Sequence, residues 1–438
     1  MVDPSRASAS GPAHDPPEPA PPVPLRRNRN YLILLTGQTI SEFGSAVSTV
    51  ALPLLVLVLT GSAIQAGFVA FANMAARFLF GIVAGALVDR WNRHRIMLVC
   101  EGGRAAAMGT LATALLLGNP PLTLIIVAVV VEGAFAALFA PSEEAAMPSV
   151  VPPEQLPNAM AAMAGRAYLG VTVGPAAGGF LFQLKHTVPF LVDAISYAFS
   201  FFLLFFLRLP RRVVAAARPK EILGEIGAGL RWVLGEPRIR VSFLSAVALN
   251  LVFNALLFTV ILVASERKVP ASEIGIMTAM LGVGGLAGAF LAPQFQSRMR
   301  PHTTVIALAW ICTLLTPLLV FVPAGIGFGL VMAAMAFPTP AATTSIQAAQ
   351  LLLTPDGLRG RLSGATQLSG GVSGALGPLT AGFLVNLTSD GMAFLICAGA
   401  LLLISLSVTF SPSLRSLPDL AKDAAGGEVP RERDPAAV

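Results

Sequence analysis

The chain contains 438 residues, of which 55% are apolar and only 12% are charged. Soluble globular proteins average about 25% charged residues, and the mean hydropathy here is +0.75. This composition places most of the chain in lipid and excludes a soluble enzyme and a disulfide scaffold. A net charge of +6 could indicate nucleic-acid binding, but no basic patch is interleaved with aromatic residues. We therefore expect no nucleic-acid partner.

The cysteines and histidines show no ligand cluster. Cys100, Cys312 and Cys397 lie far apart in apolar segments, and the four histidines are scattered along the chain. We therefore expect no metal, no cofactor and no enzymatic activity. An ATP-driven pump would need a phosphate-binding Gly-x-x-x-x-Gly-Lys-Ser/Thr loop, and the sequence contains none.

Two polar tails enclose a long series of apolar segments. Residues 1–28 are rich in Pro, Ala and Ser and lack the apolar block of a signal peptide, so they predict a disordered tail, as do residues 411–438. Each apolar segment between the tails approaches or exceeds the about 20 residues that cross a bilayer. We predict twelve transmembrane helices, at residues 31–58, 63–88, 96–117, 122–141, 158–183, 189–207, 239–263, 272–292, 303–322, 325–350, 361–387 and 391–410.

The longest internal loop, residues 208–238, divides the predicted helices into two groups of six, at 29–207 and 239–410. An apolar stripe within this loop predicts an amphipathic helix that lies on the membrane surface or packs beneath the bundle. The stripe consists of Ile222, Ile226, Leu230 and Val233.

The two groups of helices also resemble each other in sequence. Gly81 to Leu87 is similar to Gly284 to Phe290, and Gly174-Pro175 with Gly179 is similar to Gly377-Pro378 with Gly382, in both cases 203 residues later. The common spacing predicts an all-α membrane protein of two six-helix repeats, as in many secondary transporters. At this spacing Ala292 stands where the first repeat has Asp89.

Basic residues predict the orientation in the membrane. If both tails are cytoplasmic, the regions on that side contain 23 of the 29 Lys and Arg residues, and the opposite loops contain three. Cytoplasmic loops carry the excess of basic residues in membrane proteins. The sequence therefore predicts a multi-pass protein of the cell membrane with both termini in the cytoplasm. The three remaining basic residues, Arg77, Arg104 and Arg166, fall within predicted helices.

The loop after the second predicted helix reads Gly85-Ala-Leu-Val-Asp89-Arg90-Trp-Asn92-Arg93-His94-Arg95. It resembles the signature loop of the major facilitator superfamily, Gly-x-x-x-Asp-Arg-x-Gly-Arg-Arg/Lys. Gly85, Asp89, Arg90 and Arg93 match, whereas Asn92 and His94 depart from the pattern.

The resemblance implies the major facilitator fold and a latch between the two halves. We expect Gly85 to let two helices approach closely, and Asp89 to accept hydrogen bonds from the N-terminus of a neighbouring helix. The alternative is a basic loop that only sets the topology.

Five further stretches resemble the branch of this superfamily that contains the enterobactin exporter and macrolide-efflux proteins. They lie at residues 37–56, 137–160, 170–182, 190–200 and 225–240. The resemblance runs from about residue 30 to 408. It implies proton-coupled efflux of a small or medium-sized organic molecule, such as a drug, siderophore or secondary metabolite. The alternative is a transporter of the same fold that moves a lipid or nutrient, with import included. We expect a monomer whose partners are the transported molecule, protons and the bilayer.

Charged side chains inside predicted membrane helices are candidates for function. Glu42 and Glu132 lie near the middle of their helices and are interpreted as the only acids deep in the bilayer. Either could carry the coupling proton; alternatively, Glu132 forms a static pair with Arg77 or Arg166. Asp193 is interpreted as a hydrogen-bonding group at a helix end.

The second half has no acid inside its predicted helices, so we expect it to supply uncharged contacts to the substrate. The candidates for the cavity are Gln38 from the first half and Asn250, Phe253, Asn254, Gln347 and Gln367 from the second.

The predicted orientation can be tested by labelling. Single cysteines in the turns 118–121 and 323–326 of a cysteine-free variant should react with a membrane-impermeant thiol reagent on intact cells, because both turns face outward. Labelling that requires permeabilised cells would reverse the orientation.

Overall fold

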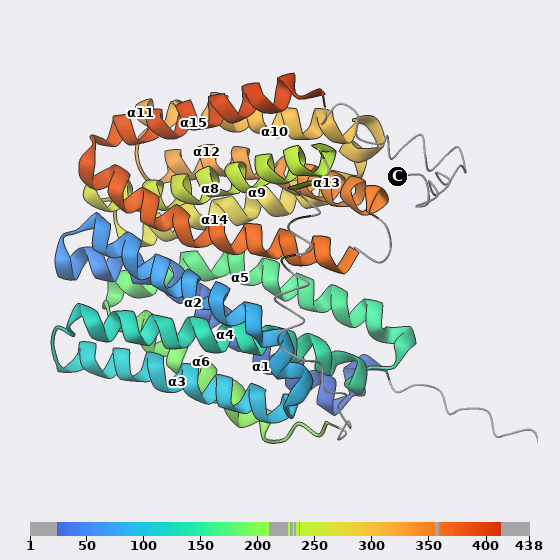
Figure 1. Ribbon diagram of the computed structural model, residues 1–438. Helices are drawn as coiled ribbons and strands as arrows, with labels where there is room; N and C mark the ends of the chain where they lie inside the picture. The colour runs from blue at the N-terminus through green and yellow to red at the C-terminus, as the bar shows by residue number, and fades with distance from the viewer. Residues whose placement is uncertain are drawn as a thin grey trace, which may run out of the picture.

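The computed structural model describes residues 24–209, 237–354 and 359–412, together with Gly227, Arg231, Leu234 and Gly235. Within these residues the chain is helical and has no β-strand. Figure 1 shows two bundles of roughly aligned helices lying against each other. The first bundle contains α1 (Arg29–Thr60), α2 (Ala63–Arg90), α3 (Arg93–Leu117), α4 (Leu122–Val150), α5 (Leu156–Leu184) and α6 (Val188–Leu204). The second contains α8 (Pro237–Glu266), α9 (Ala271–Arg298), α10 (Pro301–Leu315), α11 (Leu318–Phe321), α12 (Ile326–Ala336), α13 (Thr339–Leu353), α14 (Arg359–Leu387) and α15 (Asp390–Phe410).

The twelve predicted transmembrane helices are confirmed. Ten helical segments are long and apolar enough to cross a membrane, and two of these combine α10 with α11 and α12 with α13. The remaining two are α6, which is apolar but has only 17 residues, and α3, which has 25 residues and carries Glu101 and Arg104 among its apolar ones. Both lie alongside the other helices of the first bundle (Figure 1).

Two helices extend well beyond their predicted ends at residues 141 and 292. α4 runs through Pro141 and Pro148 to Val150, and α9 runs through Pro293 to Arg298. Membrane helices tolerate proline because neighbouring groups satisfy the freed backbone carbonyls. Proline does lie at two breaks between helices, Pro317 between α10 and α11 and Pro338 between α12 and α13.

The predicted first tail is partly ordered, because Leu25–Arg27 forms a turn of 3-10 helix and the Asn28 side chain accepts a hydrogen bond from the backbone N–H of Tyr31 at the start of α1. The amphipathic stripe of the 208–238 loop lies outside the described residues, as do residues 1–23 and 413–438.

The two bundles repeat each other, but with two different spacings. α5 and α14 each have 29 residues, and their first residues, 156 and 359, are 203 apart. α2 and α9 each have 28 residues, and their first residues, 63 and 271, are 208 apart. The predicted match of Gly81 with Gly284 is therefore out of register by five residues. Ser297, rather than Ala292, corresponds to Asp89.

The bundles meet along two pairs of helices, α2 with α14 and α5 with α9. A Cβ atom added to Gly67 of α2 would lie 2.5 Å from the carbonyl oxygen of Pro378, and one added to Gly275 of α9 would lie 2.5 Å from that of Pro175. These equivalent contacts require glycine because the backbones touch. They place the closest approach of the bundles near the turns that precede α2 and α9, at the end remote from the chain termini.

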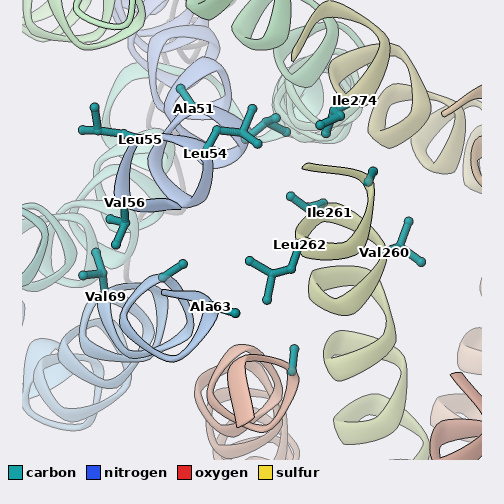
Figure 2. Packing of buried hydrophobic residues seen from close by; sticks show 14 of the residues in the cluster. Ala51, Leu54, Leu55, Val56, Ala63, Val69, Val260, Ile261, Leu262 and Ile274 are labelled. Atoms are coloured by element: carbon teal, nitrogen blue, oxygen red, sulfur yellow. The ribbon is translucent and has the colours of Figure 1, made fainter. Parts of the chain in front are cut away.

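Apolar side chains close the same end of the molecule. One buried cluster includes Ala51 and Leu55 of α1, Ala63 of α2, Leu262 of α8 and Ile274 of α9, so it joins both bundles (Figure 2). Toward the other end, a Cβ atom added to Gly81, Gly85, Gly364 or Gly370 would meet no atom within 4 Å. Gly81, Gly364 and Gly370 line a cavity of about 470 Å³ between α2 and α14. The halves are therefore closely packed at one end and leave open space beside these glycines.

We expect Gly179→Ala to loosen the sealed end, because the new methyl group would overlap the backbone carbonyl of Ala271. Gly81→Ala is the matched control, since it places the same methyl group in open space. The readout is disulfide formation between cysteines at positions 183 and 272 of a cysteine-free variant. The Gln183 side chain accepts a hydrogen bond from the Ser272 backbone N–H at 3.2 Å. Equal cross-linking in the two variants would contradict the assignment of this contact.

Candidate functional site

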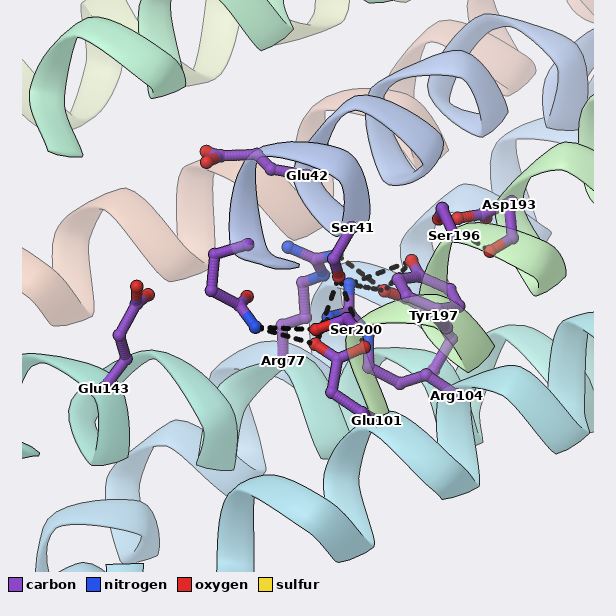
Figure 3. A network of polar contacts seen from close by, with 12 residues as sticks. Ser41, Glu42, Arg77, Glu101, Arg104, Glu143, Asp193, Ser196, Tyr197 and Ser200 are labelled. Atoms are coloured by element: carbon purple, nitrogen blue, oxygen red, sulfur yellow. Dashed lines mark hydrogen bonds and ion pairs between the residues drawn. The ribbon is translucent and has the colours of Figure 1, made fainter. Parts of the chain in front are cut away.

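The ion pairs of the described residues are concentrated inside the first bundle. Five of the six lie there, and three of their four carboxylate side chains are less than 10% exposed. The second bundle contributes the pair of Arg267 and Asp390, whose side chains are about one-third exposed. Figure 3 shows polar side chains of α1, α2, α3 and α6 converging between these helices, while Glu143 of α4 stands apart from them.

Glu132 of α4 lies between two arginines. Its Oε1 atom accepts hydrogen bonds from Arg77 of α2 at 2.9 Å and from Arg104 of α3 at 3.0 Å, while Asn73 donates to Oε2 at 2.7 Å. The prediction of a Glu132–Arg77 pair is confirmed, and the alternative pair with Arg166 does not form. Three helices are thus joined at one carboxylate.

Arg104 extends this network to a second carboxylate. It lies 3.5 Å from Glu101 on the same helix, donates to the Tyr197 hydroxyl at 2.8 Å, and its guanidinium lies 4.0 Å from the centre of the Tyr197 ring. Glu101 accepts a hydrogen bond from Ser41 of α1 at 3.0 Å. Two guanidiniums and two carboxylates make this network neutral, as buried charges require.

Gln38 belongs to the same network and is not a cavity residue. Its amide donates to Ser200 at 2.9 Å and to Glu101 at 3.4 Å, and the residue is 4% exposed. The assignment of Gln38 to the substrate cavity is therefore wrong, because its side chain points into the interface of α1 with α3 and α6.

Arg166 of α5 holds two carboxylates. It donates from Nη1 and Nη2 to both oxygens of Glu143 at 2.7 and 2.6 Å, and from Nε to Glu42 of α1 at 2.8 Å. The parallel contacts with Glu143 form a bidentate pair, which is the stronger geometry. The side chain of Glu143 is 4% exposed, whereas that of Glu42 is 37% exposed. With both acids ionised, this group carries one negative charge in excess.

Asp193 of α6 is buried without a basic partner among the described ion pairs. Ser48 of α1 donates to its Oδ2 at 2.6 Å, and Oδ1 has no hydrogen-bond partner. The residue is 1% exposed and lies five residues after the start of α6. A Cβ atom on Gly44 would overlap the Ser196 hydroxyl, so glycine allows α1 to lie close to this part of α6. Asp193 does form hydrogen bonds, as expected, but it lies inside the helix interface.

A cavity of about 250 Å³ brings several of these groups together. Glu42, Arg77, Glu132 and Asp193 line it from the first bundle, and Phe258 lines it from the second. We call this space the Glu42 cavity. The structure thus brings together both candidates for proton coupling, Glu42 and Glu132, with Arg77, one of the two candidate partners; the other, Arg166, does not line the cavity but contacts Glu42.

The predicted contribution of the second half differs from the observed one. Asn250 and Phe253 line a separate cavity of about 90 Å³ between α8, α10 and α13, and Gln367 lines one of about 470 Å³ between α2 and α14. The Asn254 amide donates to the Asn250 carbonyl within α8, and Gln347 is exposed. None of these residues lines the Glu42 cavity, although Arg77 and Met74 line both that cavity and the one containing Gln367.

The predicted close contact between helices at Gly85, near the end of α2, is not found. No atom lies within 4 Å of an added Cβ there, so Gly85 permits no close helix contact in this structure. Arg93 donates to the Ala145 carbonyl of α4 at 2.6 Å. Asn92, which departs from the superfamily pattern, caps α3 by accepting a hydrogen bond from the Arg95 N–H. The side chain of Asp89 lies outside the described part of the chain, so its role stays a prediction.

Three residues of this site, Glu101, Arg104 and Glu143, were not among the predicted site residues. Glu101 and Arg104 lie three residues apart in a predicted membrane helix, and this spacing was the available signal. Glu143 was missed because the helix was ended at residue 141. The interpretation of Glu42 and Glu132 as the only deep acids is therefore wrong, since Glu101, Glu143 and Asp193 are all less than 4% exposed.

Two helix bundles of related topology, with a charged cavity in one and a sealed interface between them, define a membrane transport protein. The chain matches the family model described as Major Facilitator Superfamily over residues 34–378, and it belongs to this superfamily.

Similar proteins include two bacterial exporters. The multidrug efflux pump Tap of Mycobacterium tuberculosis (strain ATCC 25618 / H37Rv) is 28% identical over 424 residues, covering 91% of this chain and 97% of Tap. The enterobactin exporter EntS of Salmonella typhimurium (strain LT2) is 27% identical over 396 residues, covering 87% and 93%.

Solved structures share the fold. A bacterial homologue of the iron transporter ferroportin in the inward-facing state gives a TM-score of 0.68 at 17% identity, covering 87% of this chain and 98% of that one. The nucleoside transporter NupG gives 0.67 at 14% identity, covering 89% and 100%.

We expect Glu132→Gln to destabilise the protein, because it leaves Arg77 and Arg104 facing each other without their shared carboxylate. Breaking a buried ion pair costs about 3–5 kcal/mol, and the partial exposure of Arg77 reduces this figure. Thermal unfolding and folded yield in detergent measure the effect. Glu144→Gln, at an exposed acid of the same helix, is the control, and Glu132→Gln with Arg77→Gln should recover part of the loss. A fully stable Glu132→Gln would contradict the structural role.

Proposed function

We propose that this protein exports a small or medium-sized organic molecule across the cytoplasmic membrane in exchange for protons. The similarity to Tap and EntS, both named as exporters, supports the direction. The observation that carries the proton coupling is the surplus carboxylate of the Arg166 group, which lines a cavity between the helices. A single chain supplies both halves, so the monomer is the working unit.

Glu42 is the proton carrier in this proposal. Glu143 occupies both Nη atoms of Arg166, whereas Glu42 has only the Nε contact and the more exposed side chain. Protonation of Glu42 leaves one guanidinium with one carboxylate, which is a neutral pair. Release of the proton restores the excess negative charge, so the two states differ in net charge at the cavity wall.

Glu132 has a structural role in the same proposal. Two arginines and Asn73 bind its carboxylate, and its side chain is 7% exposed. Protonation would remove the negative charge that two guanidiniums share, so the ionised form is favoured throughout the cycle. Of the two acids named from the sequence, Glu42 is the better candidate for coupling.

The orientation of the protein in the membrane indicates which step of the transport cycle the observed conformation represents. Both termini are placed in the cytoplasm because 23 of the 29 basic residues then lie in cytoplasmic regions. The closely packed end then faces outward and the open space at the other end faces inward, so the cavity loads from the cytoplasm. Opening toward the outside requires α2 to part from α14 and α5 from α9 at Gly67 and Gly275. Asp89 acts as the latch between the halves on the cytoplasmic side.

We expect Glu42→Gln to abolish uphill efflux driven by a pH gradient in everted vesicles while exchange of substrate for substrate continues. The amide cannot bind and release the coupling proton, but exchange does not require this step. Efflux of a fluorescent drug with and without the gradient provides the measurement. Glu144→Gln is the matched control because it removes an exposed acid outside the cavity lining.

Gradient-driven efflux at the normal rate in folded Glu42→Gln would overturn the assignment of Glu42. Uptake into the cell, rather than efflux, would instead support the alternative of a lipid or nutrient importer with the same fold. Substrate accumulation in everted and right-side-out vesicles separates these two directions.

A further inference from the structure

The interior of the first bundle contains more buried acids than bases. Glu101 and Glu132 are balanced by Arg77 and Arg104, and Glu143 is balanced by its bidentate contact with Arg166. Two carboxylates remain without a guanidinium of their own, those of Glu42 and Asp193. Both line the Glu42 cavity, so its wall carries an excess of negative charge.

Asp193 is the less compensated of these two acids. It forms no ion pair in the described part of the chain, and its contact with Ser48 satisfies only one of its oxygens. A buried carboxylate in this position is costly unless a proton or another cation joins it. The coupling proton of the proposed function is assigned to Glu42, which leaves Asp193 available for a second cation.

The surroundings of Asp193 suit a positive charge attached to an apolar body. Phe190 lies one helical turn before it on α6, and Phe258 faces the same cavity from α8. Met74 and Met108 are among the other apolar residues that line this cavity. Aromatic faces attract quaternary and protonated amines, and methionine adapts to ligands of different shape.

An anionic substrate finds no equivalent partner. Arg77 is the one basic residue in the described lining of the Glu42 cavity, and Glu132 already neutralises it at 2.9 Å. Arg104 and Arg166 do not line the cavity, and both are already paired with carboxylates. An added anion would therefore face Glu42 and Asp193 without compensation.

We propose that the exported molecule is an organic cation and that Asp193 is the counter-charge for its positively charged nitrogen. This inference rests on the proposed function for the direction of transport, but it concerns binding, which requires no gradient. The substrate class is thus a monovalent amine or quaternary ammonium compound with an aromatic or aliphatic body.

Isothermal titration of the purified full-length protein in detergent tests the proposal. The probes are phenyltrimethylammonium, the neutral compound benzamide and the anion benzenesulfonate. We expect the cation to bind at least tenfold more tightly than the other two. Asp193→Asn should remove this preference, because it keeps the shape and an acceptor for Ser48 but deletes the charge. Glu144→Gln should bind the cation like the unmodified protein.

Two results would overturn the proposal: equal binding of the three probes, or an unchanged preference for the cation in folded Asp193→Asn. Size-exclusion chromatography establishes whether the variant is folded, and Asp193→Glu, which keeps the charge, should retain the preference if Asn is not tolerated. Failure of the proposed function is distinguishable, since normal gradient-driven efflux by Glu42→Gln would leave the binding result unaffected.

Discussion

The structure depends on three arginines inside the first bundle, each of which needs a carboxylate on a neighbouring helix. Arg77, Arg104 and Arg166 come from α2, α3 and α5, and their acidic partners on other helices lie on α1 and α4. Because an unpaired charge inside a membrane protein is expensive, these pairs fix which helices lie together in the first bundle. The same pairs determine which acids are left over. The net charge of the cavity wall is therefore set by the acids that remain after the arginines have been paired.

The two bundles share a topology but divide their tasks. The described part of the second bundle has no buried ion pair, and its helices pack through apolar side chains and glycine. Its contribution to the Glu42 cavity is Phe258. The buried ion pairs of the described residues are thus confined to one half, while the other half packs through apolar side chains and glycine. The backbone contacts at Gly67 and Gly275 are equivalent in the two halves, so the seal is symmetric although the charges are not.

The twelve helices could be predicted from the sequence because each is an apolar segment of spanning length. The pair of Arg77 with Glu132 was also accessible, since few partners exist for a charge in such a segment. Glu143 was not, because the predicted segment ended at residue 141 whereas the helix continues to Val150. The partners of Gln38 and Arg166 depend on how the helices rotate about their axes. The apolar sequence constrains that rotation weakly. Residues that face a cavity and residues that face a neighbouring helix therefore lie close together in the sequence of one helix.

The composition of α3 has a consequence for how the protein enters the membrane. It is not among the helices apolar enough to be recognised as spans, because Glu101 and Arg104 lie within it. An acid or base near the centre of a helix opposes insertion by about 2.5–3.5 kcal/mol each, and their mutual contact at 3.5 Å offsets only part of this. One stabilising partner of α3, Ser41 of α1, is synthesised before α3. Two others, Glu132 of α4 and Tyr197 of α6, are synthesised after it. We therefore expect α3 to gain much of its stability in the bilayer only after α4 and α6 have been synthesised, so that the first bundle inserts cooperatively.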